Sequence, residues 1–136
     1  MDLKNKVLND QIKPEELRIG NLIYIPETNQ VAFISMVHKH LGVYVNDGFI
    51  ILGFHQIRKI KLNDEMVKSV GYEFDNDNIL KFGNCLYFLD DFLQIASGPA
   101  PIVNLKCEFV HELQNAHFAL FNNEICFDRN LIEKLR

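Results

Sequence analysis

Short apolar runs separated by turn-forming residues fill the first half of the chain, and they constrain its fold more than any other feature. The runs are rich in β-branched and aromatic residues, which favour strands, and they cover residues 22–25, 31–37, 42–45, 49–52 and 54–62. Asp47-Gly48, between the third and fourth runs, is a strong signal for a tight hairpin. Five short strands joined by tight turns predict a small meander or an SH3-like, partly open barrel.

The second half of the sequence predicts helices around a further set of antiparallel strands. Asn63 is a favourable N-cap for a helix that follows the first strand set, and strand-like runs then continue to residue 107. Residues 108–121 carry apolar side chains at three- and four-residue spacing, which predicts an amphipathic helix. A short strand over 125–127 and a C-terminal helix over 130–136 complete the prediction. Because strands and helices do not alternate regularly, the predicted fold class is α+β and β-rich.

The length of the chain predicts a single domain over residues 1–136, since this is the usual size of one domain. Hydrophobic residues make up 48% of the sequence, which is typical of globular proteins and argues against a disordered chain. Within the domain, the subregions 20–62 and 72–107 are rich in strand-forming residues, whereas residues 1–12 have the mixed composition of an N-terminal arm.

The charge balance disfavours nucleic-acid binding. The formal net charge is −4, whereas a nucleic-acid binder normally has a basic excess or a clustered basic face. Arg58, Lys59 and Lys61 form the one local basic run, and a strand there would place Lys59 and Lys61 on one face. A solvated strand edge is the simpler interpretation, and a nucleic-acid contact through these three residues is kept as an alternative.

The cysteine pattern indicates a reducing compartment. Cys85, Cys107 and Cys126 are far apart in the sequence, and each lies in an apolar stretch, so we expect buried free thiols instead of disulfides. No apolar run has the length of a signal peptide or of a membrane span, so no contact with a membrane is predicted. The predicted location is the cytoplasm of the cell that produces the protein.

Histidines are the residues with the most potential for chemistry. His38 and His40 would point to the same side of a strand, and His55 could add a third imidazole, so these three are the candidates for a metal site. Carboxylate ligands at helpful spacing are missing from the sequence around them. No catalytic residue, no cofactor and no metal are therefore predicted.

The late helix and the turn before the first strand supply the candidate binding residues. His111, Gln114 and Asn115 are predicted on the polar face of the helix, opposite an apolar stripe that contains His117. Arg18 and Asn21 lie in the predicted turn. All five candidates could hydrogen-bond a partner, although a role within their own fold is the simpler interpretation.

Two end motifs carry a resemblance to known proteins. The segments Leu17-Arg18-Ile19-Gly20-Asn21 and 110–120, read as VHELQNAHFAL, resemble the start and the late helix of a group of small proteins from Bacteroidetes and their bacteriophages. Glu112 stands where that group usually has glutamine, and Ala116-His117 stands where it usually has Leu-Tyr. The resemblance implies a phage or prophage origin and carries no activity with it.

Taken together, these features predict a small non-enzymatic interaction module whose partner is another protein or a second copy of the chain. A phage accessory protein that acts on a host factor fits this description. A small-molecule binder or enzyme with a pocket between the two strand sets is an alternative from a different class.

Overall fold

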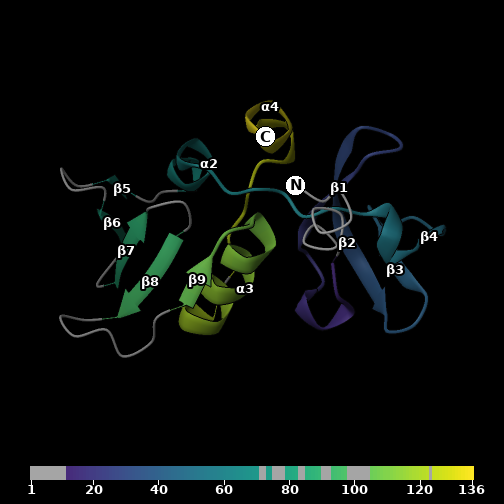
Figure 1. Cartoon of the computed structure of the whole chain (residues 1–136), viewed down its shortest axis with the longest axis horizontal. Helices are drawn as coiled ribbons and strands as arrows, with labels where there is room; N and C mark the ends of the chain where they lie inside the picture. The colour runs from purple at the N-terminus through teal and green to yellow at the C-terminus, as the bar shows by residue number, and fades with distance from the viewer. Residues whose placement is uncertain are drawn as a thin grey trace, which may run out of the picture. The chain divides into compact units, whose positions relative to one another are not determined.

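The computed structural model describes residues 12–70, 73–74, 79–82, 85–89, 93–97, 105–122 and 124–136 (Figure 1). Side chains are described for residues 12–70, 107–119, 122 and 124–136. The chain divides into two compact units, Met1–Ile60 and Lys61–Arg136, and each is described by itself. The single domain over 1–136 stays a prediction, and the predicted arm lies outside the described residues except for Ile12.

Unit 1 is built on a four-stranded antiparallel meander. Its strands are β1 (Leu22–Ile25), β2 (Gln30–His38), β3 (Gly42–Val45) and β4 (Ile51–Leu52). A short 3-10 helix, η1 (Pro14–Glu16), precedes the strands, and a second 3-10 helix, η2 (Phe54–Gln56), follows them. The strand order is β1-β2-β3-β4. After η2 the chain returns to β1, where Tyr24 and Arg58 exchange backbone hydrogen bonds of 2.9 and 2.8 Å. The sheet is not closed into a barrel, so the prediction of a meander or partly open barrel is confirmed.

The core of unit 1 consists of aliphatic side chains that pack on one face of the meander. Ile12, Ile23, Ile34, Val43 and Ile57 are each at most 1% exposed. Burying a side chain of this kind stabilises a fold by about 1.5–3 kcal/mol. These contacts hold the strands together, because β3 and β4 are too short to be stable as isolated hairpins.

Two expectations for unit 1 are wrong. Residues 54–62 do not form a fifth strand, because the side chain of Gln56 accepts a hydrogen bond from the Gly53 backbone N–H at 2.8 Å and closes a 3-10 turn. The fourth strand begins at Ile51 and not at residue 49, and Phe49 and Ile50 project from the sheet instead of pairing.

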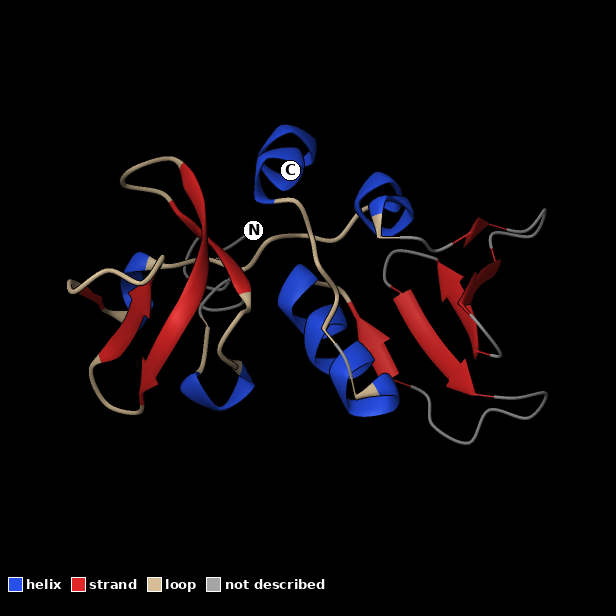
Figure 2. Cartoon of the chain, turned by 180° about the vertical axis from the view of Figure 1, so that it is seen from behind, coloured by secondary structure: helices blue, strands red, loops and turns tan. Residues whose placement is uncertain are grey.

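Unit 2 combines three helices with a second antiparallel sheet. Its elements are α2 (Asp64–Ser69), β5 (Glu73–Phe74), β6 (Ile79–Phe82), β7 (Cys85–Leu89), β8 (Leu93–Ser97), β9 (Leu105–Cys107), α3 (Val110–Phe121) and α4 (Arg129–Leu135). The strands follow one another in chain order across the sheet. Helix α3 lies beside β9, and α2 lies beside α4 (Figure 2). The α+β class is therefore confirmed.

The end of unit 2 differs from the prediction in two respects. Residues 124–128 form no regular element, so the strand expected over 125–127 is wrong. Cys107 is buried as expected, but Cys126 is exposed because its segment runs outside any sheet. The side chain of Cys85 lies outside the described residues. None of the helices among the described residues is long and apolar enough to cross a membrane.

Candidate functional site

The late helix buries most of the face that was expected to bind a partner. His111 is 0% exposed and Gln114 is 3% exposed, so both side chains lie inside the fold, and a role for them in binding stays a prediction. His117 is buried, as its place on the apolar stripe predicts, and Asn115 is half-buried. The buried arc of α3 is wider than its apolar residues indicate, since it also includes the polar side chains of His111 and Gln114 on one flank of the stripe. A partner could reach Asn115 in this conformation but not His111 or Gln114.

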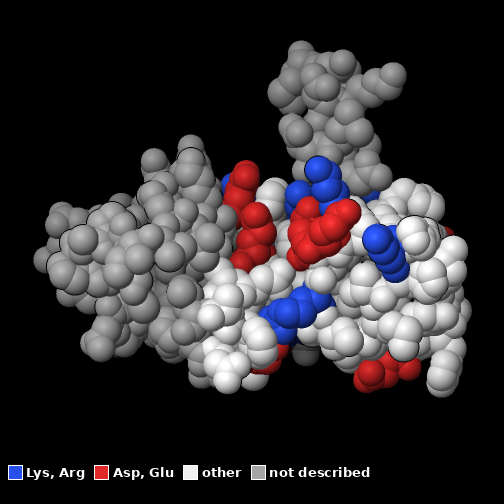
Figure 3. Space-filling model, turned by 90° about the horizontal axis from the view of Figure 1, so that it is seen from below, with Lys and Arg blue, Asp and Glu red and all other residues white. Residues whose placement is uncertain are grey.

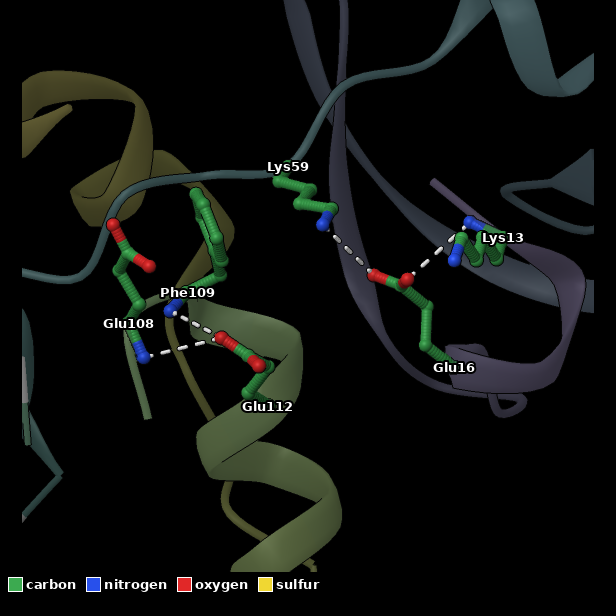
Figure 4. Close-up of polar contacts among 6 residues, drawn as sticks. All are labelled: Lys13, Glu16, Lys59, Glu108, Phe109 and Glu112. Carbon is green, nitrogen blue, oxygen red and sulfur yellow. Dashed lines mark hydrogen bonds and ion pairs between the residues drawn. The ribbon is translucent and has the colours of Figure 1, made fainter. Parts of the chain in front are cut away.

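The start of the same helix is organised by Glu112. One carboxylate oxygen, Oε1, accepts hydrogen bonds from the backbone N–H groups of Glu108 at 3.1 Å and Phe109 at 3.0 Å (Figure 4). The bond from Phe109, the N-cap residue, satisfies a donor that the helix start leaves without an intrahelical partner. Burial, together with the negative charge of Glu112, raises the pKa of the Cys107 thiol to about 12. Cys107 is therefore a neutral thiol near neutral pH and a poor nucleophile.

Arg18 and Asn21 are joined in a closed turn. The backbone N–H of Arg18 donates to the Asn21 side-chain oxygen at 2.7 Å, and the Asn21 backbone N–H donates to the Arg18 carbonyl at 3.1 Å. Gly20 supplies a φ of +96°, which side chains rarely adopt. Because Asn21 is 0% exposed, it serves the turn, and a ligand cannot reach its side chain.

The three basic candidates do not share a strand face, because the strand expected there does not form. In unit 1, Lys59 lies 3.4 Å from Glu16 (Figure 4), and Arg58 donates to the backbone carbonyl of His55 at 2.6 Å. In unit 2, Lys61 lies 3.1 Å from Glu108. On the face drawn in Figure 3, the described basic side chains lie next to acidic ones and do not form a separate patch. Each cation is thus held by a partner within its own unit.

The histidine candidates are not arranged as a metal site. His38 ends β2 and His40 lies in the following turn, so the two do not share a strand face as a metal site there would need. The Nδ1 atom of His38 accepts hydrogen bonds from the backbone N–H groups of His40 at 3.3 Å and Leu41 at 3.2 Å. His55 is exposed in η2. Within the described part of the chain, no three His, Cys, Asp or Glu residues are grouped so that they could hold a metal ion.

An exposed apolar surface that sequence reasoning missed lies at the loop 46–50, between β3 and β4. Phe49 is 97% exposed and Ile50 is 79% exposed, and Met36 on the neighbouring strand β2 is 55% exposed. We call these three residues, with the grooves beside them, the Phe49 surface. Four consecutive apolar residues over 49–52 were the available signal, but their pattern does not distinguish a paired strand from a projecting loop.

The base of this loop is fixed to β2. The backbone N–H of Asn46 donates to the Phe33 carbonyl at 2.9 Å, and the Asn46 side-chain oxygen accepts from the Phe33 N–H at 3.1 Å. Ser35 sits at a register shift in β2, and its hydroxyl accepts from the Asp47 N–H at 3.2 Å. Three hydrogen bonds thus attach the base of the loop to β2.

Two grooves flank Phe49. The first has a volume of about 360 Å³ and includes Met36, Tyr44 and Asp47 in its wall. The second has a volume of about 270 Å³ and is formed by loop and strand residues that include Ile25, Glu27 and Leu52. Both walls expose more apolar than polar area, so the projecting side chains and the hollows beside them form one continuous apolar surface.

No protein-family model matches this sequence, and no curated protein or solved structure is significantly similar to it.

Proposed function

We propose that the chain is a non-enzymatic protein-interaction module that binds its partner through the Phe49 surface. The observation that carries the proposal is the exposure of Phe49, which is 97% accessible on a loop with a fixed base. Large aromatic side chains that enter a pocket of a partner supply much of the energy of protein interfaces. A projecting phenyl ring with an apolar groove on each side has the form of such an anchor.

The chemistry of the other candidates supports binding over catalysis. Burial holds Cys107 as a neutral thiol, with its pKa raised to about 12. His38 uses its Nδ1 atom to accept backbone hydrogen bonds at 3.3 and 3.2 Å, which leaves one ring nitrogen for other contacts. Neither group is arranged with a second one to form the acid–base or nucleophile–base pair that catalysis needs. Among the described residues, no specific observation therefore favours the enzyme alternative.

The origin and location of the protein belong to the same proposal. The LRIGN segment and the late helix support a phage or prophage accessory protein that acts on a host factor. The buried free thiol of Cys107 is compatible with the reducing cytoplasm of a bacterial cell.

Capture of partners from a lysate of a Bacteroidetes host tests this function. Wild-type protein and the variant Phe49→Ser are compared as baits, with Leu41→Ser as the matched control. Leu41 is also an exposed apolar residue of unit 1, at 61%, but it lies in the turn between β2 and β3 and outside both grooves. We expect proteins that bind the wild type and the Leu41 variant but not the Phe49 variant. The same set of proteins on all three baits would contradict the proposal.

A further inference from the structure

The charges around Phe49 are acidic on both sides. Asp47 contributes to the wall of the first groove and Glu27 to the wall of the second. Neither wall includes a Lys or Arg among its described residues. Each groove therefore combines an apolar lining with one carboxylate.

Lys39, the nearest cation to Asp47 in the sequence, is too far along the sheet to neutralise the Asp47 carboxylate. Between residues 19 and 57 the one Lys or Arg is Lys39, which lies in the turn beyond the opposite end of β3 from Asp47. The four residues of β3 between them span about 10 Å, at about 3.3 Å per residue. Because the screening length in physiological salt is about 8 Å, Lys39 has little effect on the potential at Asp47.

We infer that the Phe49 surface binds a peptide segment of a partner protein that carries Lys or Arg beside apolar side chains. This inference rests on the proposed function and adds the chemistry of the partner. The apolar side chains fill the grooves and contact the Phe49 ring, and the cations lie opposite Asp47 and Glu27 at the rim. Complementary charge of this kind mainly sets the choice of partner and the rate of association.

A second copy of the chain fits this surface less well. A two-fold contact brings the same patch of both copies together. It would therefore gather the Asp47 and Glu27 carboxylates of both copies at one interface, with no cation among the described groove residues to compensate. Like charges brought together in this way disfavour a partner, so self-association is an outcome that the test must detect.

The first test is a selection of random dodecapeptides displayed on phage against the full-length protein. Peptides that also bind the Phe49→Ser variant are removed, and the remaining sequences are compared with the unselected library. We expect Lys and Arg to be enriched next to apolar residues, and Asp and Glu to be depleted. Peptides that depend on Phe49 but show no enrichment of cations would overturn the inference about charge.

The second test measures the affinity of one selected peptide by fluorescence anisotropy. We expect the double variant Glu27→Gln, Asp47→Asn to weaken binding about three- to tenfold, as for two exposed charge pairs, and to reduce its dependence on salt. Asparagine tolerates the left-handed conformation of residue 47, so the loop keeps its shape. Glu15→Gln in η1 is the control, since Glu15 is exposed and lies outside both grooves. Equal affinity for all variants would overturn the inference.

Two further outcomes separate this inference from the proposed function. If lysate capture depends on Phe49 but no Phe49-dependent peptide is selected, the peptide inference fails and the interaction module stands. If light scattering shows concentration-dependent association that Phe49→Ser abolishes, the occupant is a second copy and the inference is again overturned. If capture from the lysate does not depend on Phe49, the proposed function itself fails.

Discussion

At the scale of single residues, Asn46 and Asp47 determine where Phe49 lies. Both have a positive φ, of 52° and 58°, in the left-handed region that asparagine and aspartate tolerate better than other side chains. Asn46 also contributes its side-chain oxygen to the hydrogen bond from the Phe33 N–H, at 3.1 Å. Position 46 therefore has two separable roles, one in the conformation of the loop and one in its attachment to β2.

Substitutions at position 46 should separate these two roles. We expect Asn46→Ala to lower the free energy of unfolding by about 1–2 kcal/mol, because alanine is strained in the left-handed region and lacks the acceptor. Asn46→Gly should be less destabilising, since glycine adopts a positive φ without strain and loses only the side-chain bond. Urea denaturation of the three proteins measures the difference. An alanine variant as stable as the wild type would show that the loop is not fixed at this residue.

Two cysteines should differ sharply in reactivity. Cys126 is exposed, whereas Cys107 is buried and its pKa is raised to about 12 from 9.0. At pH 8 the thiolate fraction of a group with this pKa is about 1 in 10,000. A maleimide should therefore label Cys126 within minutes and Cys107 only after denaturation, as read by mass spectrometry of the peptides. Equal labelling of both in the native protein would contradict the burial of Cys107.

At the scale of elements, Asn63 connects two helices of unit 2. Its side-chain oxygen accepts from the Met66 N–H at 3.0 Å and caps α2, and its amide nitrogen donates to the Leu135 carbonyl of α4 at 2.8 Å. Asn63→Ala should lower the free energy of unfolding by about 0.5–2 kcal/mol, as for other lost N-caps. Asn63→Ser keeps an N-cap oxygen and loses only the bond to α4, so it should lower the free energy of unfolding less than Asn63→Ala does. Thermal denaturation orders the variants, and a serine variant less stable than alanine would refute this assignment.

The elements also show which parts of the fold the sequence could predict. The ranges of β1 and β3 agree with the predicted runs, and α3 begins within two residues of its prediction, because hydrophobic periodicity is a local property. The prediction of a strand over 54–62 was wrong because one hydrogen bond, from the Gly53 backbone N–H to the Gln56 side-chain oxygen, favours a turn over a strand. The burial of His111 and Gln114 depends on what packs around α3, which no periodicity within the helix contains.

The candidate site was harder to predict than the fold for a related physical reason. Phe49 and Ile50 belong to an apolar run that has the composition of a strand, and only the pairing of Tyr44 with Ile51 decides where β4 begins. Exposure of a large apolar side chain is a property of the folded surface. The sequence therefore predicted the turn beside the site but not the site itself.

At the scale of the whole molecule, we propose that the chain acts by contact with another protein at the Phe49 surface. Such a contact requires an exposed apolar side chain, Phe49, on a loop whose base is attached to the sheet. It also requires a local charge, here from Asp47 and Glu27, that selects the partner. The net charge of −4 is consistent with a partner that contributes cations. These features all lie in unit 1.

Site-specific photocrosslinking tests this claim most directly. A benzophenone amino acid replaces Phe49 in one variant and Leu41 in another, and each protein is produced and irradiated in a bacterial host. Both positions are exposed, at 97% and 61%, so neither replacement should disturb the core. The account predicts a discrete covalent adduct with a partner protein from position 49 and none from position 41. Adducts of equal yield from both positions, or no adduct from position 49, would contradict it.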